Sequence, residues 1–167
     1  MTATVAHGAP VTAEHHERLT RNVDRMPATA DLIGKAEPAE LSLALEQTCA
    51  FLTDLLVPHM EAVERAVYPE LERLFQNKHA MTPMRREHAE IRARIREIEE
   101  VRGTAKRGPL TLTNQMRLRR ALFSAYALMK IHLAEELLYG DIIEAGATPD
   151  QEAALATAMI HAGTGSF

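Results

Sequence analysis

One stretch of this chain, residues 113–145, repeats core-type residues at alternating spacings of four and three. This spacing keeps side chains on one face of a long α-helix, as in helices that pack together along a seam. The chain shows no strict apolar–polar alternation of the kind that predicts a β-strand. The sequence therefore predicts an all-α protein. The predicted seam of this stretch consists of Leu118, Leu122, Ala125, Met129, His132, Glu136, Tyr139 and Ile143.

Helix-breaking and helix-capping residues divide the chain into further predicted helices. They place helices at residues 12–26, 38–77, 83–102 and 113–145, with a short fifth helix at 149–161. A loop is expected at residues 27–37, and Pro58 and Pro69 are expected to kink the second helix. Long helices with short connections predict an up-down-up-down four-helix bundle over residues 12–146. Residues 147–167 then form the short C-terminal helix and a tail.

Composition and charge exclude several classes of protein. The chain has 167 residues, a formal net charge of −4 and a pI of about 6.1, which give no basic footprint for nucleic acid. Its single cysteine, Cys49, excludes an internal disulfide framework and a cysteine-based zinc site. No apolar run predicts a membrane span, and no secretory leader is expected at the N-terminus. We therefore expect a cytoplasmic protein without nucleic-acid or membrane partners.

Histidine occupies positions where a helical bundle normally carries an apolar residue. The seams of the first three long helices place His16, His59 and His88 on inward faces, and the fourth adds His132 and Glu136. Two of the histidines lie near the starts of the first and third helices, and two lie late in the second and fourth. In an antiparallel bundle these positions fall at one depth, so the four imidazoles are expected to meet in one layer.

This layer predicts a metal site. A single histidine on an apolar stripe is usually a hydrogen-bonded core residue, but four at one depth on four helices favour a shared ligand. A buried carboxylate beside them is costly unless it is paired or bound to a cation. Imidazole and carboxylate suit iron, zinc, copper or manganese. The predicted metal ligands are His16, His59, His88, His132 and Glu136.

Residues that flank the predicted ligands are given other roles. His15 is expected to be exposed, because the seam of the first helix selects its neighbour. Glu87 belongs to a run of alternating basic and acidic residues that predicts a solvated helix face. Tyr68 is expected in the core or at its rim.

With these motifs the chain resembles the hemerythrin-like, HHE cation-binding family. The resemblance covers residues 12–145. It implies a non-haem di-iron centre that binds dioxygen or related small molecules, in proteins that bind oxygen, sense iron or oxygen, or respond to oxidants or nitric oxide. The segments that carry it are His16 to Leu19, the His-Glu-Glu-aromatic-Pro pattern of residues 58–69, residues 87–91, and the His-x-x-x-Glu of residues 132–136.

Two positions depart from the family pattern. The family's bridging glutamate, four residues after the second-helix histidine, is Val63 here, and Glu64 lies about 100° further round the helix. The position four residues after His88, often a further histidine in the family, is Arg92, which cannot bind a metal. Arg92 could instead pair with Glu64 or Glu136.

These departures leave three outcomes open. Four histidines and one glutamate suit a single metal with five protein ligands. Two metals would need Glu64, Glu61 or Tyr68 to enter the site, or water to complete it. A third outcome is a site that has lost tight metal binding, with an Arg92–Glu136 ion pair replacing the charge of the cation. Non-haem iron, di-iron or mononuclear, is the expected cofactor, and another divalent metal is the alternative.

The function that follows is the binding or sensing of dioxygen, peroxide or nitric oxide at this metal. No nucleophile–base pair or glycine-rich phosphate loop points to an enzyme, so turnover of peroxide or nitric oxide at the metal is kept as an alternative. A further alternative is a helical bundle that has a degenerate metal site and acts by binding protein partners. The C-terminal helix, with Leu155, Met159 and Ile160 on one face, could cap the bundle or contact a second subunit in a homo-oligomer.

Overall fold

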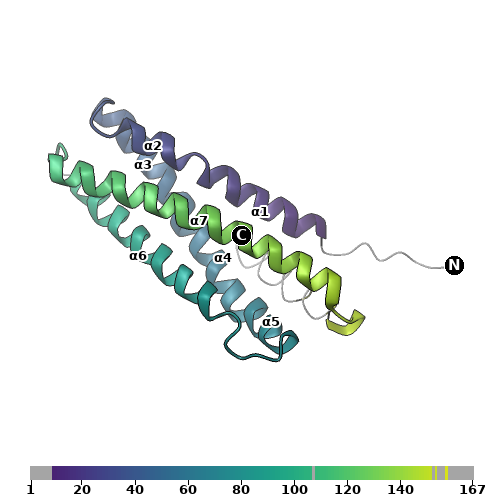
Figure 1. Ribbon diagram of the computed structural model, residues 1–167. Coiled ribbons are helices and arrows are strands. Elements are labelled where there is room, and N and C mark those ends of the chain that lie inside the picture. Colours follow the sequence, from purple (N-terminus) through teal and green to yellow (C-terminus); the bar gives the residue numbers. More distant parts are fainter. Residues whose placement is uncertain (1–8, 107, 152, 154–156, 158–167) are drawn as a thin grey trace.

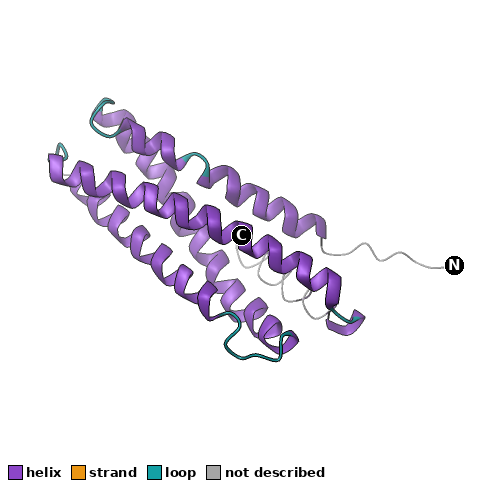
Figure 2. Cartoon of the chain, viewed as in Figure 1, coloured by secondary structure: helices purple, strands orange, loops and turns teal. Residues whose placement is uncertain are grey.

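The chain folds into helices joined by short turns. The computed structural model describes residues 9–106, 108–151, 153 and 157, and within them it contains helices and no β-strand (Figure 2). The predicted all-α class is therefore confirmed. The helices form four stretches, separated by turns at residues 33–37, 75–81 and 106–111. These stretches lie side by side, and successive stretches run in opposite directions (Figure 1).

The first stretch is divided into α1 (Ala9–Val23) and α2 (Met26–Leu32). The prediction of a loop at residues 27–37 is wrong for its first half, because Pro27 lies at the start of a helix. Proline is tolerated in the first helical turn, where its missing N–H would have no partner. The helix α1 also begins three residues before the expected Thr12. The buried residues of α2 are Met26, Thr29 and Ala30.

The second stretch is a continuous helical run that contains two wider, π-helical turns. Proline removes an N–H from a helix, and its ring clashes with the carbonyl four residues earlier. The carbonyls in question for Pro58 and Pro69 belong to Asp54 and Arg65, and both lie in the π-helical turns. The wider turns therefore let the helix continue past each proline. The segments are α3 (Pro38–Ala50), η1 (Phe51–Leu56), α4 (Val57–Ala62), η2 (Val63–Val67) and α5 (Tyr68–Leu74).

The seam of this stretch differs from the count by threes and fours at one position. The N–H of Val57 bonds to the carbonyl of Leu52, five residues earlier, which adds one residue to the turn. Counting by threes and fours predicts Leu55 as a core residue. Instead Leu56 is buried, with 1% exposure, and Leu55 only packs against the edge of the core.

The run Pro38–Leu74 is apolar enough to qualify, by length and composition, as a candidate membrane span. Its most apolar window has a mean hydropathy of 1.2, a value that core helices of soluble proteins also reach. The packing of α3 against α2 and α6 accounts for part of this apolar character.

The third and fourth stretches, α6 (Thr82–Ala105) and α7 (Leu112–Gly146), match their predicted ranges closely. Gly103 does not end α6, which continues for two more residues. The cap of α7 is Thr111, one residue before the helix begins, since its Oγ1 accepts the N–H of Asn114 at 3.3 Å.

A capping box, a reciprocal pair of hydrogen bonds at a helix start, follows α7. The N–H of Thr148 donates to Gln151 Oε1 at 2.8 Å, and the N–H of Gln151 donates to Thr148 Oγ1 at 3.4 Å. Most of the helix predicted at residues 149–161 lies outside the described residues.

The interior consists of two apolar clusters with a polar layer between them. The helix α7 contacts α1, α2 and α6, and α3 contacts α2 and α6, so the stretches enclose a common core. We call the polar layer the histidine layer, because His59, His88 and His132 are buried in it, with 4%, 0% and 1% exposure. The larger apolar cluster includes Leu19, Leu45, Leu52, Ile95 and Leu122, and the smaller one includes Val63, Tyr68, Leu71 and Met84.

Candidate metal centre

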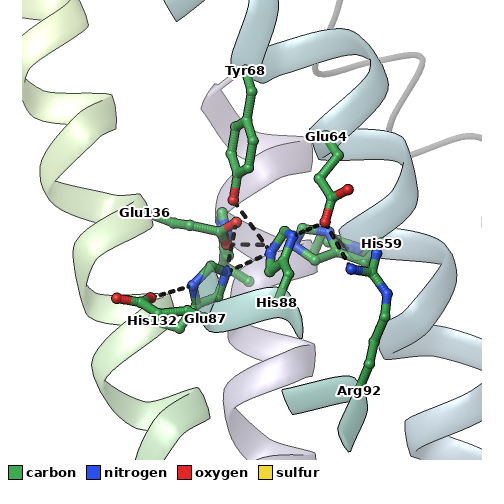
Figure 3. Close-up of polar contacts among 10 residues, drawn as sticks. His59, Glu64, Tyr68, Glu87, His88, Arg92, His132 and Glu136 are labelled. Carbon is green, nitrogen blue, oxygen red and sulfur yellow. Dashed lines mark hydrogen bonds and ion pairs between the residues drawn. The ribbon is translucent and has the colours of Figure 1, made fainter. Parts of the chain in front are cut away.

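The structure brings all five predicted ligands together, and Glu136 lies between two pairs of histidines. His16 of α1 and His59 of α4 form one group with Glu136, and His88 of α6 and His132 of α7 form another group with the same Glu136. Within each group the potential ligand atoms all lie within 4.8 Å of one another. The cluster is thus two adjacent three-residue groups that share one carboxylate (Figure 3).

The two oxygens of Glu136 face different histidines. Oε2 lies 2.9 Å from His16 Nε2 and 3.4 Å from His59 Nε2, while Oε1 lies 3.3 Å from His132 Nε2. The side chain is only 7% exposed, and among the described residues Oε1 has no hydrogen-bond partner. Burial alone would raise the pKa of Glu136, but the imidazoles of His59, His132 and His16 hold that pKa well below its usual value. The carboxylate is therefore ionised and buried.

The ring nitrogens of His88 and His132 point at each other and at carboxylates. His88 Nδ1 lies 2.6 Å from Glu64 Oε1, and His132 Nδ1 lies 2.8 Å from Glu87 Oε2. A carboxylate accepts hydrogen bonds, so each Nδ1 carries the hydrogen and each Nε2 of a neutral ring presents a lone pair. These two Nε2 atoms face each other at 2.9 Å. Two lone pairs at this distance need a proton or a cation between them.

The pKa values of this pair agree with a single shared proton when no metal is bound. Burial and the neighbouring His132 lower the pKa of His88 to about 4, against the hydrogen bond to Glu64. Burial would also lower the pKa of His132, but Glu136 and Glu87 outweigh it and raise that pKa. The pair therefore already attracts positive charge at its centre.

The distances in the cluster also fit metal ligation. Two ligand atoms that each lie about 2.05 Å from a metal are about 2.9 Å apart at a right angle and about 3.3 Å apart at the tetrahedral angle. The pairs His88–His132 and His16–Glu136 are 2.9 Å apart, and the pairs His132–Glu136 and His59–Glu136 are 3.3 and 3.4 Å apart. The donor set of imidazole nitrogen and carboxylate oxygen is one that iron, manganese and zinc accept.

His59 is supported by a residue that the sequence placed at the surface. His15 Nε2 lies 3.1 Å from His59 Nδ1, so the expectation that His15 is exposed is wrong. Burial, followed by the charges of His59, Arg18 and His16, lowers the pKa of His15 to about 4. A neutral His15 thus shares a hydrogen bond with the ring nitrogen of His59 that points away from Glu136.

Tyr68 lies on the Nε2 side of His88. Its hydroxyl is 3.2 Å from His88 Nε2, and the side chain is buried with 1% exposure, as expected for a core residue. Burial and the charges of Glu136, Glu64 and Glu87 raise the pKa of Tyr68 far above its usual value. The hydroxyl therefore keeps its proton, and it lies against the same nitrogen of His88 that faces His132.

The two departures from the family pattern have separate outcomes. Val63 is buried at 8% exposure in the smaller apolar cluster. Arg92 donates to Glu64 at 2.9 Å, so the suggested Arg92–Glu136 ion pair is wrong and the suggested pairing with Glu64 is confirmed. Burial would raise the pKa of Glu64, but hydrogen bonds from Arg92 and His88 lower it. Glu64 therefore lies behind His88 and does not enter the cluster.

The residues that the sequence missed, His15 and Glu87, each directly precede a predicted ligand. A residue beside a seam position lies about 100° round the helix, where it can reach the back of a histidine on a neighbouring helix. Glu87 of α6 does this for His132 of α7, and His15 of α1 does it for His59 of α4. A search for polar residues next to the seam histidines would have found both.

Comparisons with known proteins agree with the chemistry of the cluster. A family model described as "Hemerythrin HHE cation binding domain" matches residues 7–140, a range that contains all five predicted ligands. No curated protein and no solved structure gives a match. The match covers most of the chain, and it confirms the resemblance inferred from the sequence.

Proposed function

Because this chain belongs to the hemerythrin HHE cation-binding family, we propose that it is a cytoplasmic non-haem iron protein that holds two cations in its histidine layer. Its four helical stretches would serve as the up-down-up-down bundle of that family. The proposed role is to bind or sense dioxygen, peroxide or nitric oxide. The observation that supports this proposal is the position of Glu136, whose two oxygens face two different histidine pairs.

The proposed ligand sets follow from the two groups. His16, His59 and Glu136 Oε2 would hold one cation, and His88, His132 and Glu136 Oε1 would hold the other. A carboxylate that reaches two cations can replace the bridging glutamate that Val63 does not supply. This arrangement favours two metals over the single five-ligand metal that the sequence left open.

Tyr68 is the strongest candidate for a sixth ligand among the residues that the sequence suggested. Glu64 lies on the Nδ1 side of His88, and Glu61 is exposed on α4. The hydroxyl of Tyr68 is the one that lies against the inward nitrogen of His88. It would either bind the cation directly or donate a hydrogen bond to a small molecule held there.

The chain's own residues would prepare the site for a small ligand. Iron in this nitrogen and oxygen environment supplies reversible binding and reduction of small oxidants. Glu64 and Glu87 fix the tautomers of His88 and His132, so that both rings direct Nε2 inward. The apolar clusters on either side of the layer exclude bulk water from it.

Metal analysis of untagged protein purified without oxygen tests the proposal. We expect two irons per chain in the wild type and in His79→Ala, which changes an exposed histidine in the turn before α6. His132→Ala should retain one iron at most. A wild-type chain that holds no metal after ferrous iron is added would contradict the proposal. A visible spectrum of the loaded protein that oxygen, peroxide and nitric oxide all leave unchanged would contradict its small-molecule role alone.

A partner-binding role is a second candidate, which a separate observation favours. The four most exposed large apolar side chains among the described residues of α7 lie on one side of the helix, and exposed apolar surface of this kind can mark a protein interface. Light scattering of the wild type and of Ile131→Glu would test this role. A wild-type dimer that Ile131→Glu dissociates would support this role. If both proteins are monomers, self-association through this surface is excluded. These side chains are Leu112, Met116, Ile131 and Leu138, with 72%, 66%, 57% and 60% exposure.

A further inference from the structure

The two halves of the cluster have different residues behind them. On one side, the Nδ1 atoms of His88 and His132 bond to the carboxylates of Glu64 and Glu87, at 2.6 and 2.8 Å (Figure 3). On the other side, the Nδ1 atom of His59 meets the imidazole of His15 at 3.1 Å. One half is thus supported by two anions and the other by a histidine.

This difference changes how strongly each half attracts a cation. A carboxylate that accepts the Nδ1 hydrogen pushes electron density toward Nε2 and makes the imidazole a stronger ligand. A neutral imidazole is a weaker acceptor than a carboxylate, and a charged imidazole would repel a nearby cation. In either form, His15 supports a cation less well than Glu64 or Glu87 does.

The burial of the two halves differs in the same direction. The side chains of His88 and His132 are 0% and 1% exposed, whereas those of His16 and His59 are 16% and 5% exposed. In the buried half, two Nε2 atoms also face each other at 2.9 Å, and a cation between them would be stabilised by both. The hydroxyl of Tyr68 adds a further oxygen to that half.

We propose that the two metal positions are unequal, and that a divalent transition-metal cation fills the His88–His132–Glu136 half first and binds it more tightly than the His16–His59–Glu136 half. Glu64 and Glu87 act as positioning residues that set this order. Arg92 pairs with Glu64 and moderates its charge, so Glu87 has the larger effect. This inference rests on the proposed function, because it requires that the cluster binds metal.

Stepwise zinc titration of the full-length apo protein by calorimetry tests the inference, since zinc introduces no redox chemistry. We expect two resolved binding steps in the wild type. Glu87→Gln should weaken the tighter step by about 10–100-fold, and Glu64→Gln should weaken it less. Neither should change the weaker step by more than a few fold. Glu90→Gln removes the same charge from an exposed position on α6 and should leave both steps unchanged.

The converse variants locate the weaker step. His16→Ala should abolish it and leave the tighter step intact, and His15→Gln should weaken it alone. Circular dichroism of each apo variant shows that the helices are retained. Loss of the tighter step in His16→Ala, or equal weakening of both steps by Glu87→Gln, would overturn the inference while metal binding itself stands. A wild-type chain that binds neither zinc nor ferrous iron would contradict the proposed function, and with it the inference.

Discussion

The larger apolar cluster and the histidine layer lie on the same helices, but their side chains need different kinds of partner. In the cluster, Leu19, Leu45 and Leu122 are fully buried among apolar side chains. In the layer, two Nε2 atoms face each other at 2.9 Å, and Glu136 Oε1 has no hydrogen bond among the described residues. Apolar packing needs only close contact, whereas buried polar groups need partners. The cations proposed for the layer would supply partners for these buried groups.

The largest effect is expected from Glu136→Ala, which removes the one residue that both halves of the layer share. We expect the loss of both cations, with affinity reduced more than about 100-fold, because each group loses a ligand and the buried carboxylate between them. Metal analysis after dialysis measures this effect. Glu61→Ala is the control. It removes an exposed carboxylate from α4 and should retain both metals. Retention of both metals by Glu136→Ala would contradict the account.

Leu122→Ala is the matching change in the larger apolar cluster. A cavity at this fully buried position should lower the free energy of unfolding by about 2–5 kcal/mol, as measured in urea. Leu122 lies ten residues before His132 on α7, about 15 Å along the helix, so the metal content of the folded protein should not change. The neighbouring Phe123 is 38% exposed, and Phe123→Ala should cost less. Metal loss in folded Leu122→Ala would show that the two regions are not independent.

Acid should destabilise the apo protein through the histidine layer. Folded His88 stays neutral down to a pKa of about 4, whereas in the unfolded chain it takes up a proton near pH 6.5. Between these values the unfolded state binds more protons, so the free energy of unfolding falls as the pH is lowered from 6.5 to about 4. For one fully buried histidine the loss is roughly 3 kcal/mol.

Urea unfolding of the apo protein at several pH values measures this loss. His88→Gln should remove most of the dependence in this window, and an unchanged dependence in that variant would assign it to other groups. The raised pKa of His132 acts in a different window: its contribution is present below pH 6.5 and is lost as the pH rises through its folded pKa.

The smallest effect is expected from Arg92→Gln. Arg92 and Glu64 are 26% and 29% exposed, and a partly exposed ion pair contributes at most about 1 kcal/mol. We expect a small loss of stability and an unchanged number of bound metals. If Arg92→Gln instead lost all stability or gained metal that the wild type does not bind, Arg92 would be a replacement for the cation, as in a degenerate site.

The sequence predicted the positions of the histidine layer because its residues follow the helical period. His88, His132 and Glu136 occupy seam positions on uninterrupted helices, and the structure places all three in the core. His15 and Glu87 were missed because they lie beside the seam, where periodicity alone predicts solvent. Their roles depend on the distance to a ring on another helix, which a one-dimensional pattern does not contain.

The errors in the fold have local physical causes. Pro27 was interpreted as the end of a helix, although proline is equally suited to the first turn of the next one. In the second stretch Leu56, and not Leu55, lies in the core between Leu52 and His59. Steps of four and then three residues fit the helical period as well as steps of three and then four, so the count alone did not decide between the two leucines.

The most direct test of the central claim is anomalous diffraction at the iron edge from crystals of the iron-loaded protein. The account predicts two peaks in the histidine layer, one beside His16 and His59 and one beside His88 and His132, with the carboxylate of Glu136 between them. A single peak, or two peaks that do not both contact Glu136, would contradict a two-metal centre that shares this residue.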